Sequence, residues 1–219
     1  MAELLVWPVL IAYGEAAVAY AGELRGPGLG GRLATWGVRL GWLAQTALLA
    51  AQALSRDGFP WGTWAGALNL FVWLVVGGYL IWGCRPRYRL LGLVLMPVAA
   101  GLLVLAWAGG GTAVAGGDAA GVLLALHAGL MLAGFAGFTV AAAMAGLYLV
   151  EERRLKRRDA GVLRLRFPPL ESLERLSART AGAGLALLTA GMIVGLVSLE
   201  REDVDAAMAV TVEAEDRKS

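Results

Sequence analysis

His127 is the only histidine in this sequence and the side chain best suited to ligand chemistry. It lies near the start of a long apolar run that ends in the basic stretch "EERRLKRR". A neutral imidazole in such a setting either hydrogen-bonds to a backbone carbonyl or ligates a metal ion. Residue type and position leave these two interpretations open.

Amide and indole side chains are expected at a depth similar to that of His127. Gln45 and Asn69 interrupt two other apolar runs, and Trp61 and Trp64 begin the second of these. In isolation, such amides indicate hydrogen bonds between membrane helices, and such tryptophans indicate the membrane interface. With glycine and alanine around them, the same residues also suit a haem, with His127 as axial ligand. The pattern alone does not separate these alternatives.

Glu15 and Arg39 are the ionisable residues placed deepest in the first two apolar runs. At 1.5 Å per residue, they lie roughly 10 Å and 9 Å from the ends joined by the first short loop. Charges inside a membrane are costly, and opposite charges at one level offset part of that cost. We therefore expect a structural ion pair between Glu15 and Arg39.

The composition identifies a membrane protein. Of 219 residues, 58% are hydrophobic and only 16% are charged, and the mean hydropathy is +0.66. A single cysteine, Cys84, excludes an internal disulfide and a cysteine cluster for zinc or iron and sulfur. The net charge of +2 indicates no nucleic-acid partner, because the basic residues lie in loops between apolar runs.

Six apolar runs are long enough for membrane helices, which need about 20 residues each. The sequence therefore predicts an all-α, polytopic bundle of six transmembrane helices, packed through the abundant glycine and alanine. The six runs cover residues 4–22, 33–54, 61–83, 90–108, 121–150 and 180–199.

Basic residues gather in alternate connections, which places those loops in the cytoplasm and both termini outside. Within the longest basic connection, residues 159–179, leucines at three-residue spacing predict a short amphipathic helix on the cytoplasmic surface. We predict one membrane domain over residues 1–199 and an acidic extracytoplasmic tail over residues 200–219.

The run "LHAGLMLAGFAGFTVAAAMAGLYLVEERRLKRR" resembles the membrane core of the cytochrome c assembly protein family. This family includes haem-handling proteins of CcsA, ResC and CcmC type and HemX-like proteins. "GWLAQTALLAAQAL", "RYRLLGLVLMPVAAG" and "FPPLESLERLSAR" resemble other family segments in the same order. The resemblance covers most of the chain from Trp36 to Gly195.

The resemblance implies a haem-handling factor for cytochrome c biogenesis in a bacterial cytoplasmic membrane, with His127 as an axial ligand of haem iron. Gln45, Asn69, Trp61 and Trp64 would line the cofactor. Implied partners are membrane lipid, other maturation or haem biosynthesis proteins, and apocytochrome c.

Two family features are missing here. Gln45 stands where many relatives have a histidine, and no tryptophan-rich segment with a later histidine follows the sixth helix. The chain therefore looks like a short member, and we do not expect complete haem lyase or synthase activity from it alone. The alternative is a HemX-like structural or regulatory protein that binds no haem. A small-solute transporter, supported by Glu15, ranks third.

Overall fold

The computed structural model describes residues 2–23, 30–54, 63–83, 88, 90–113, 121–157 and 169–216. All regular structure in these ranges is helical, which confirms the predicted all-α class and the number of helices. A 3-10 turn, η1 (Ala2–Leu5), precedes six α-helices. They are α1 (Val6–Glu23), α2 (Gly30–Leu54), α3 (Trp64–Gly83), α4 (Leu90–Ala108), α5 (Val122–Lys156) and α6 (Leu170–Asp216).

Four of these helices are long and apolar enough to cross a membrane, which supports a multi-pass membrane protein. They are α3, α4, α5 and α6. Helix α1 is apolar but shorter, and α2 carries Arg39, Gln45 and Gln52, which lower its hydropathy. That α1 and α2 also cross the membrane stays a prediction.

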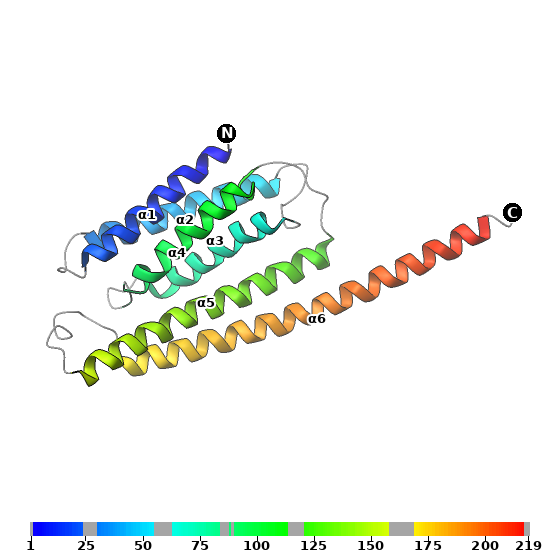
Figure 1. Cartoon of the computed structure of the whole chain (residues 1–219). Coiled ribbons are helices and arrows are strands. Elements are labelled where there is room, and N and C mark those ends of the chain that lie inside the picture. Colours follow the sequence, from blue (N-terminus) through cyan, green and yellow to red (C-terminus); the bar gives the residue numbers. More distant parts are fainter. Residues whose placement is uncertain are drawn as a thin grey trace.

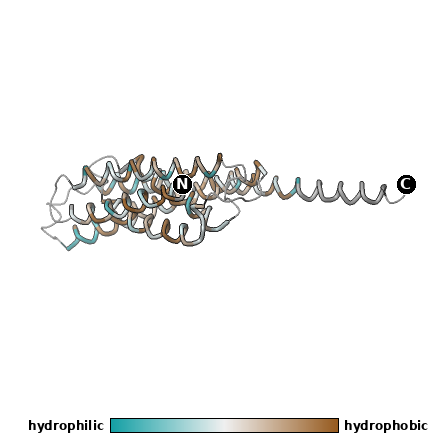
Figure 2. Tube along the Cα trace, turned by 90° about the horizontal axis from the view of Figure 1, so that it is seen from above, coloured by the Kyte–Doolittle hydropathy of each residue, from teal (hydrophilic) through white to brown (hydrophobic). Residues whose placement is uncertain are grey.

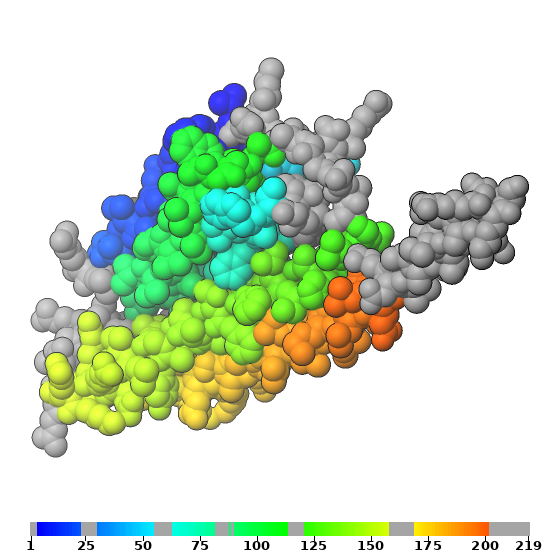
Figure 3. Space-filling model, turned by 45° about the vertical axis from the view of Figure 1, so that its right-hand side comes forward, coloured from blue at the N-terminus to red at the C-terminus, as the bar shows by residue number. Residues whose placement is uncertain are grey.

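Helices α1 to α4 lie together, α5 packs on α3, and α6 runs along α5 (Figure 1). The space-filling view in Figure 3 shows α5 and α6 side by side along one edge of the molecule. In Figure 2, hydrophobic residues cover the helices, and hydrophilic residues gather at the end where α5 finishes. We call this end, marked by Arg153, Arg154, Lys156 and Arg175, the basic end.

Three tyrosines form the centre of the four-helix group. Tyr13, Tyr20 and Tyr79 are completely buried, and the Tyr79 hydroxyl donates a 3.0 Å hydrogen bond to the Tyr20 hydroxyl. The Tyr20 ring fits against Gly92 of α4, where an added Cβ would lie only 2.4 Å from it. Gly92 therefore has no space for a side chain.

Helix α6 extends beyond the predicted apolar run 180–199 at both ends. The segment "LESLERLSAR", predicted as a short surface helix, forms the first part of α6, and its Leu173 is fully buried. Residues 200–216, predicted as a separate tail, continue the same helix. This segment contains neither glycine nor proline and is rich in alanine and glutamate, which favour helix.

Two glycines of α4, one packed against Tyr20 and one facing open space, allow a test of this contact. Gly92→Ala is expected to lower the free energy of unfolding by about 1 to 3 kcal/mol, because the new methyl group overpacks against Tyr20. Gly101→Ala is the matched control, since nothing lies within 4 Å of its added Cβ. Thermal unfolding of both variants in detergent measures the difference, and equal melting temperatures would contradict the proposed fit.

Candidate functional site

Glycines allow α5 and α6 to approach closely along their length. An added Cβ on Gly137 would lie 3.3 Å from the Cα of Gly184, and one on Gly134 would lie 2.6 Å from the Leu188 side chain. Lipid provides no hydrophobic drive for helix association, so close contact through small residues supplies the attraction. We call this contact the glycine seam; farther from the basic end it continues through Gly191 and Gly195.

His127 lies in the glycine seam, at the half of α5 far from the basic end. Its Nδ1 is 2.7 Å from the carbonyl oxygen of Gly191. A carbonyl only accepts, so Nδ1 carries the hydrogen and donates it. In the neutral imidazole this leaves Nε2 as a lone-pair donor.

Gly195 sets the position of the His127 ring. An added Cβ there would lie 2.7 Å from Nδ1 and 2.8 Å from Cε1, so the ring edge rests directly on this glycine. Gly191 and Gly195, one helical turn apart, therefore supply the acceptor and the space respectively. The spacing "GMIVG" in the sequence is the signal that could have revealed them.

The amides of Gln45 and Asn69 belong to a different group of contacts, which we call the amide network. The Tyr13 hydroxyl donates to Gln45 Oε1 at 2.8 Å, and Gln45 Nε2 donates to Asn69 Oδ1 at 2.9 Å and to the Asn69 carbonyl at 3.1 Å. Both amide side chains are completely buried. The network thus joins α1, α2 and α3.

The amide network also binds the turn after α4. Gln52 Nε2 donates to the carbonyls of Gly111 and Ala113, and Asn69 Nδ2 donates to Gly111 as well. Gly110 has a positive φ of 79°, and the Gly111 N–H reaches back to the Ala106 carbonyl, as in a glycine-terminated helix. Two carbonyls of the turn after α4 thereby gain amide partners.

The structure divides the predicted site residues. Gln45 and Asn69 satisfy one another, whereas His127 bonds to α6, and no described hydrogen bond joins the two groups. Trp64 lies 67% exposed at the start of α3, with its ring against Gly109. Trp61 lies outside the described residues.

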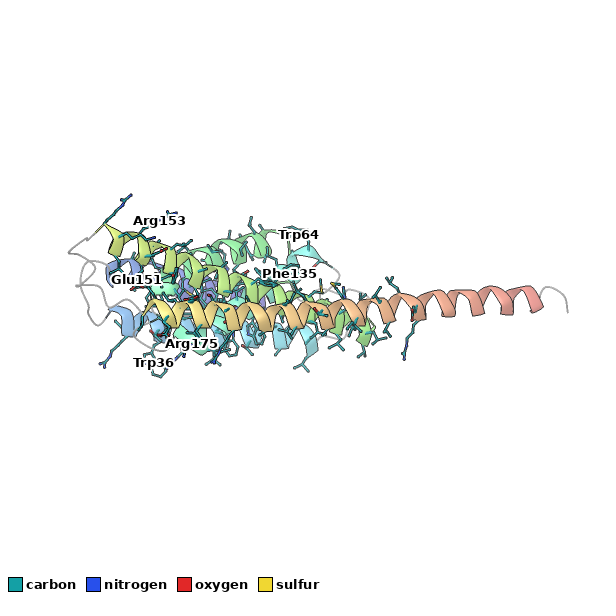
Figure 4. All side chains as sticks on the ribbon, turned by 90° about the horizontal axis from the view of Figure 1, so that it is seen from below. Trp36, Trp64, Phe135, Glu151, Arg153 and Arg175 are labelled. Atoms are coloured by element: carbon teal, nitrogen blue, oxygen red, sulfur yellow. The ribbon has the colours of Figure 1, made fainter. Side chains whose placement is uncertain are left out.

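The labelled charged side chains lie at one end of the bundle. Figure 4 places Glu151, Arg153 and Arg175 at the basic end and Trp64 toward the other end.

Within the described ranges, no three His, Cys, Asp or Glu side chains gather to hold a metal ion.

The predicted ion pair between Glu15 and Arg39 is not formed. Arg39 lies over the Trp36 ring, 4.9 Å from its centroid, and Glu15 is exposed. The cause is helical phase: Arg39 precedes Trp42 by three residues, and Trp42 faces α3, not α1. Arg39 therefore lies on the side of α2 that carries Trp42.

The sequence interpretation also missed a tryptophan pair between α2 and α3. The rings of Trp42 and Trp73 stack with centroids 5.1 Å apart. Trp42 Nε1 donates to the Trp73 carbonyl, and Trp73 Nε1 donates to Thr46 Oγ1. Every indole hydrogen of this pair is satisfied, so the pair acts as an interhelical brace.

Comparison with known proteins gives a consistent result. The family model described as "Cytochrome C assembly protein" matches residues 61–200. The chain is 26% identical over 160 residues to Protein HemX of Brevibacillus brevis, covering 71% of this chain and 58% of HemX. It thus spans less than two thirds of that relative's length. No solved structure matches.

The amide network yields a test based on one hydroxyl group. Tyr13→Phe is expected to lower the free energy of unfolding by about 1 kcal/mol, because Gln45 Oε1 loses its donor inside the bundle. Tyr148→Phe is the control: Tyr148 is half-buried and its hydroxyl has no described hydrogen bond. Denaturation in detergent compares them, and a Tyr13→Phe protein as stable as the control would contradict the assignment.

Proposed function

Because the chain belongs to the cytochrome c assembly protein family, we propose that it handles haem in a membrane, with His127 as an axial ligand. The observation that carries this proposal is the hydrogen bond from His127 Nδ1 to the Gly191 carbonyl. Metal-bound imidazoles usually donate their second ring hydrogen in this way, which fixes the tautomer and the ring orientation.

The residues around His127 fit this role. The imidazole is half-buried, so it remains reachable, and the glycine seam holds its Nδ1 edge against α6. The three ring atoms nearest the added Cβ of Gly195 are Nδ1, Cε1 and Cγ, so Nε2 lies farther from α6 at that point. Haem, when bound, supplies an iron atom that such a nitrogen ligates.

A second ligand for the iron would have to come from outside the residues around His127. Met131 lies one turn after His127 on the same helix and packs against Gly191, so it cannot serve the opposite face of a macrocycle. Gln45 and Asn69 brace the four-helix group through the amide network. We assign the second position to an apocytochrome or a partner protein.

The proposed setting is a bacterial cytoplasmic membrane, with the basic end in the cytoplasm and His127 in the outer half. The binding partners that we propose are proteins of cytochrome c maturation or haem biosynthesis. The role is that of an assembly factor.

A second candidate function is supported by the similarity to HemX. Here the bundle is a structural or regulatory membrane protein that binds no haem and acts through its basic end. This alternative predicts partners that are captured equally well from haem-depleted and haem-replete cells.

Wild type and two variants test the haem proposal on purified protein supplied with haemin. Wild type is expected to show a Soret band that shifts relative to free haemin, and His127→Ala is expected to lose it. Gly195→Ala is expected to weaken haem binding tenfold or more, because its methyl group displaces the ring from Gly191. Spectral titration measures all three.

Gly182→Ala provides the matched control on α6, since nothing lies within 4 Å of its added Cβ. Its haem affinity should equal that of wild type. An unchanged Soret band in His127→Ala would remove the ligand assignment. A wild-type protein that leaves the spectrum of haemin unchanged would favour the alternative that binds no haem.

A further inference from the structure

A cleft runs along α5, between α3 and α6. Its volume is about 270 Å³, and its walls are apolar over most of their extent. Both neighbouring helices pack on α5, but α3 and α6 do not pack closely on each other, which leaves the space between them. Small residues widen it further: Gly78, Ala133, Gly137 and Ala183 line the cleft.

One cation, Arg179, lines this cleft, with Thr180 beside it. Arg175, one turn earlier on α6, pairs with Glu171, whereas Arg179 is exposed and forms no ion pair with a described residue. The lining of α6 continues from Arg179 to Leu187, a length of about 12 Å. The cleft therefore has a cationic end and an apolar body.

Arg179 lies where the headgroup of a membrane lipid would be expected. It immediately precedes the uncharged stretch 180–199 of α6, and it lies toward the basic end (Figure 4 shows Arg175 there). Basic residues near a membrane surface attract anionic lipids. A guanidinium also matches phosphate oxygens in a two-bond geometry.

We propose that this cleft binds one anionic phospholipid, with its phosphate on Arg179 and an acyl chain between α3 and α6. Haem also combines anionic groups with an apolar body, but it fits this cleft less well than a phospholipid does. The lining contains no His, Met, Cys or Tyr to ligate its iron. The site is independent of the function proposed for His127, which does not line the cleft.

The test is native mass spectrometry of the purified full chain with phosphatidylglycerol or phosphatidylcholine added. Wild type should retain one phosphatidylglycerol in preference to phosphatidylcholine. Arg179→Gln should reduce this retention about fivefold or more, whereas Arg175→Gln, which removes a cation already paired with Glu171, should retain it. Both arginines are exposed, so neither change endangers folding.

A second pair of variants tests the apolar body of the cleft. Ala183→Leu adds volume inside it and should lower phosphatidylglycerol retention, whereas Ala186→Leu, exposed on the same helix but outside the lining, should not. Equal losses in Arg179→Gln and Arg175→Gln would overturn the proposal. So would displacement of the lipid by inorganic phosphate alone, or by haemin.

Discussion

The close approach of α5 and α6 is the constraint on which the other features depend. Without a hydrophobic drive between helices in lipid, these two helices hold together because glycine backbones come into contact. The same glycines give His127 its acceptor and its space, and they leave room for the cleft beside α3. Packing, ligand geometry and lipid access thus share one cause.

The four-helix group solves the same problem with polar contacts. Its amides, tyrosines and stacked tryptophans satisfy one another between α1, α2, α3 and the turn after α4. Such saturated groups resist rearrangement, because breaking any one bond leaves a buried donor or acceptor without a partner. The molecule therefore combines a four-helix group held by polar contacts with a helix pair, α5 and α6, that packs through glycine and carries His127.

Periodicity and hydropathy were sufficient to predict six helices, and four of the predicted runs are the long apolar helices of the structure. The extent of α6 was not predictable in this way, because a charged stretch ends an apolar run without ending a helix. Depth counting predicted Glu15 and Arg39 at one level, but depth does not give the direction in which each side chain leaves its helix. Only the orientation of α2, set by Trp42 against α3, shows that the charges lie apart.

The contact between His127 and Gly195 also restricts which substitutions these two positions tolerate. A side chain of any size at Gly195 would occupy the place of the His127 ring, while loss of the histidine would leave Gly195 free to change. The two positions, 68 residues apart in the chain, are therefore expected to vary together among related proteins. A relative that lacks the histidine should tolerate larger residues at the position equivalent to Gly195, and one that retains the histidine in this orientation should keep glycine there.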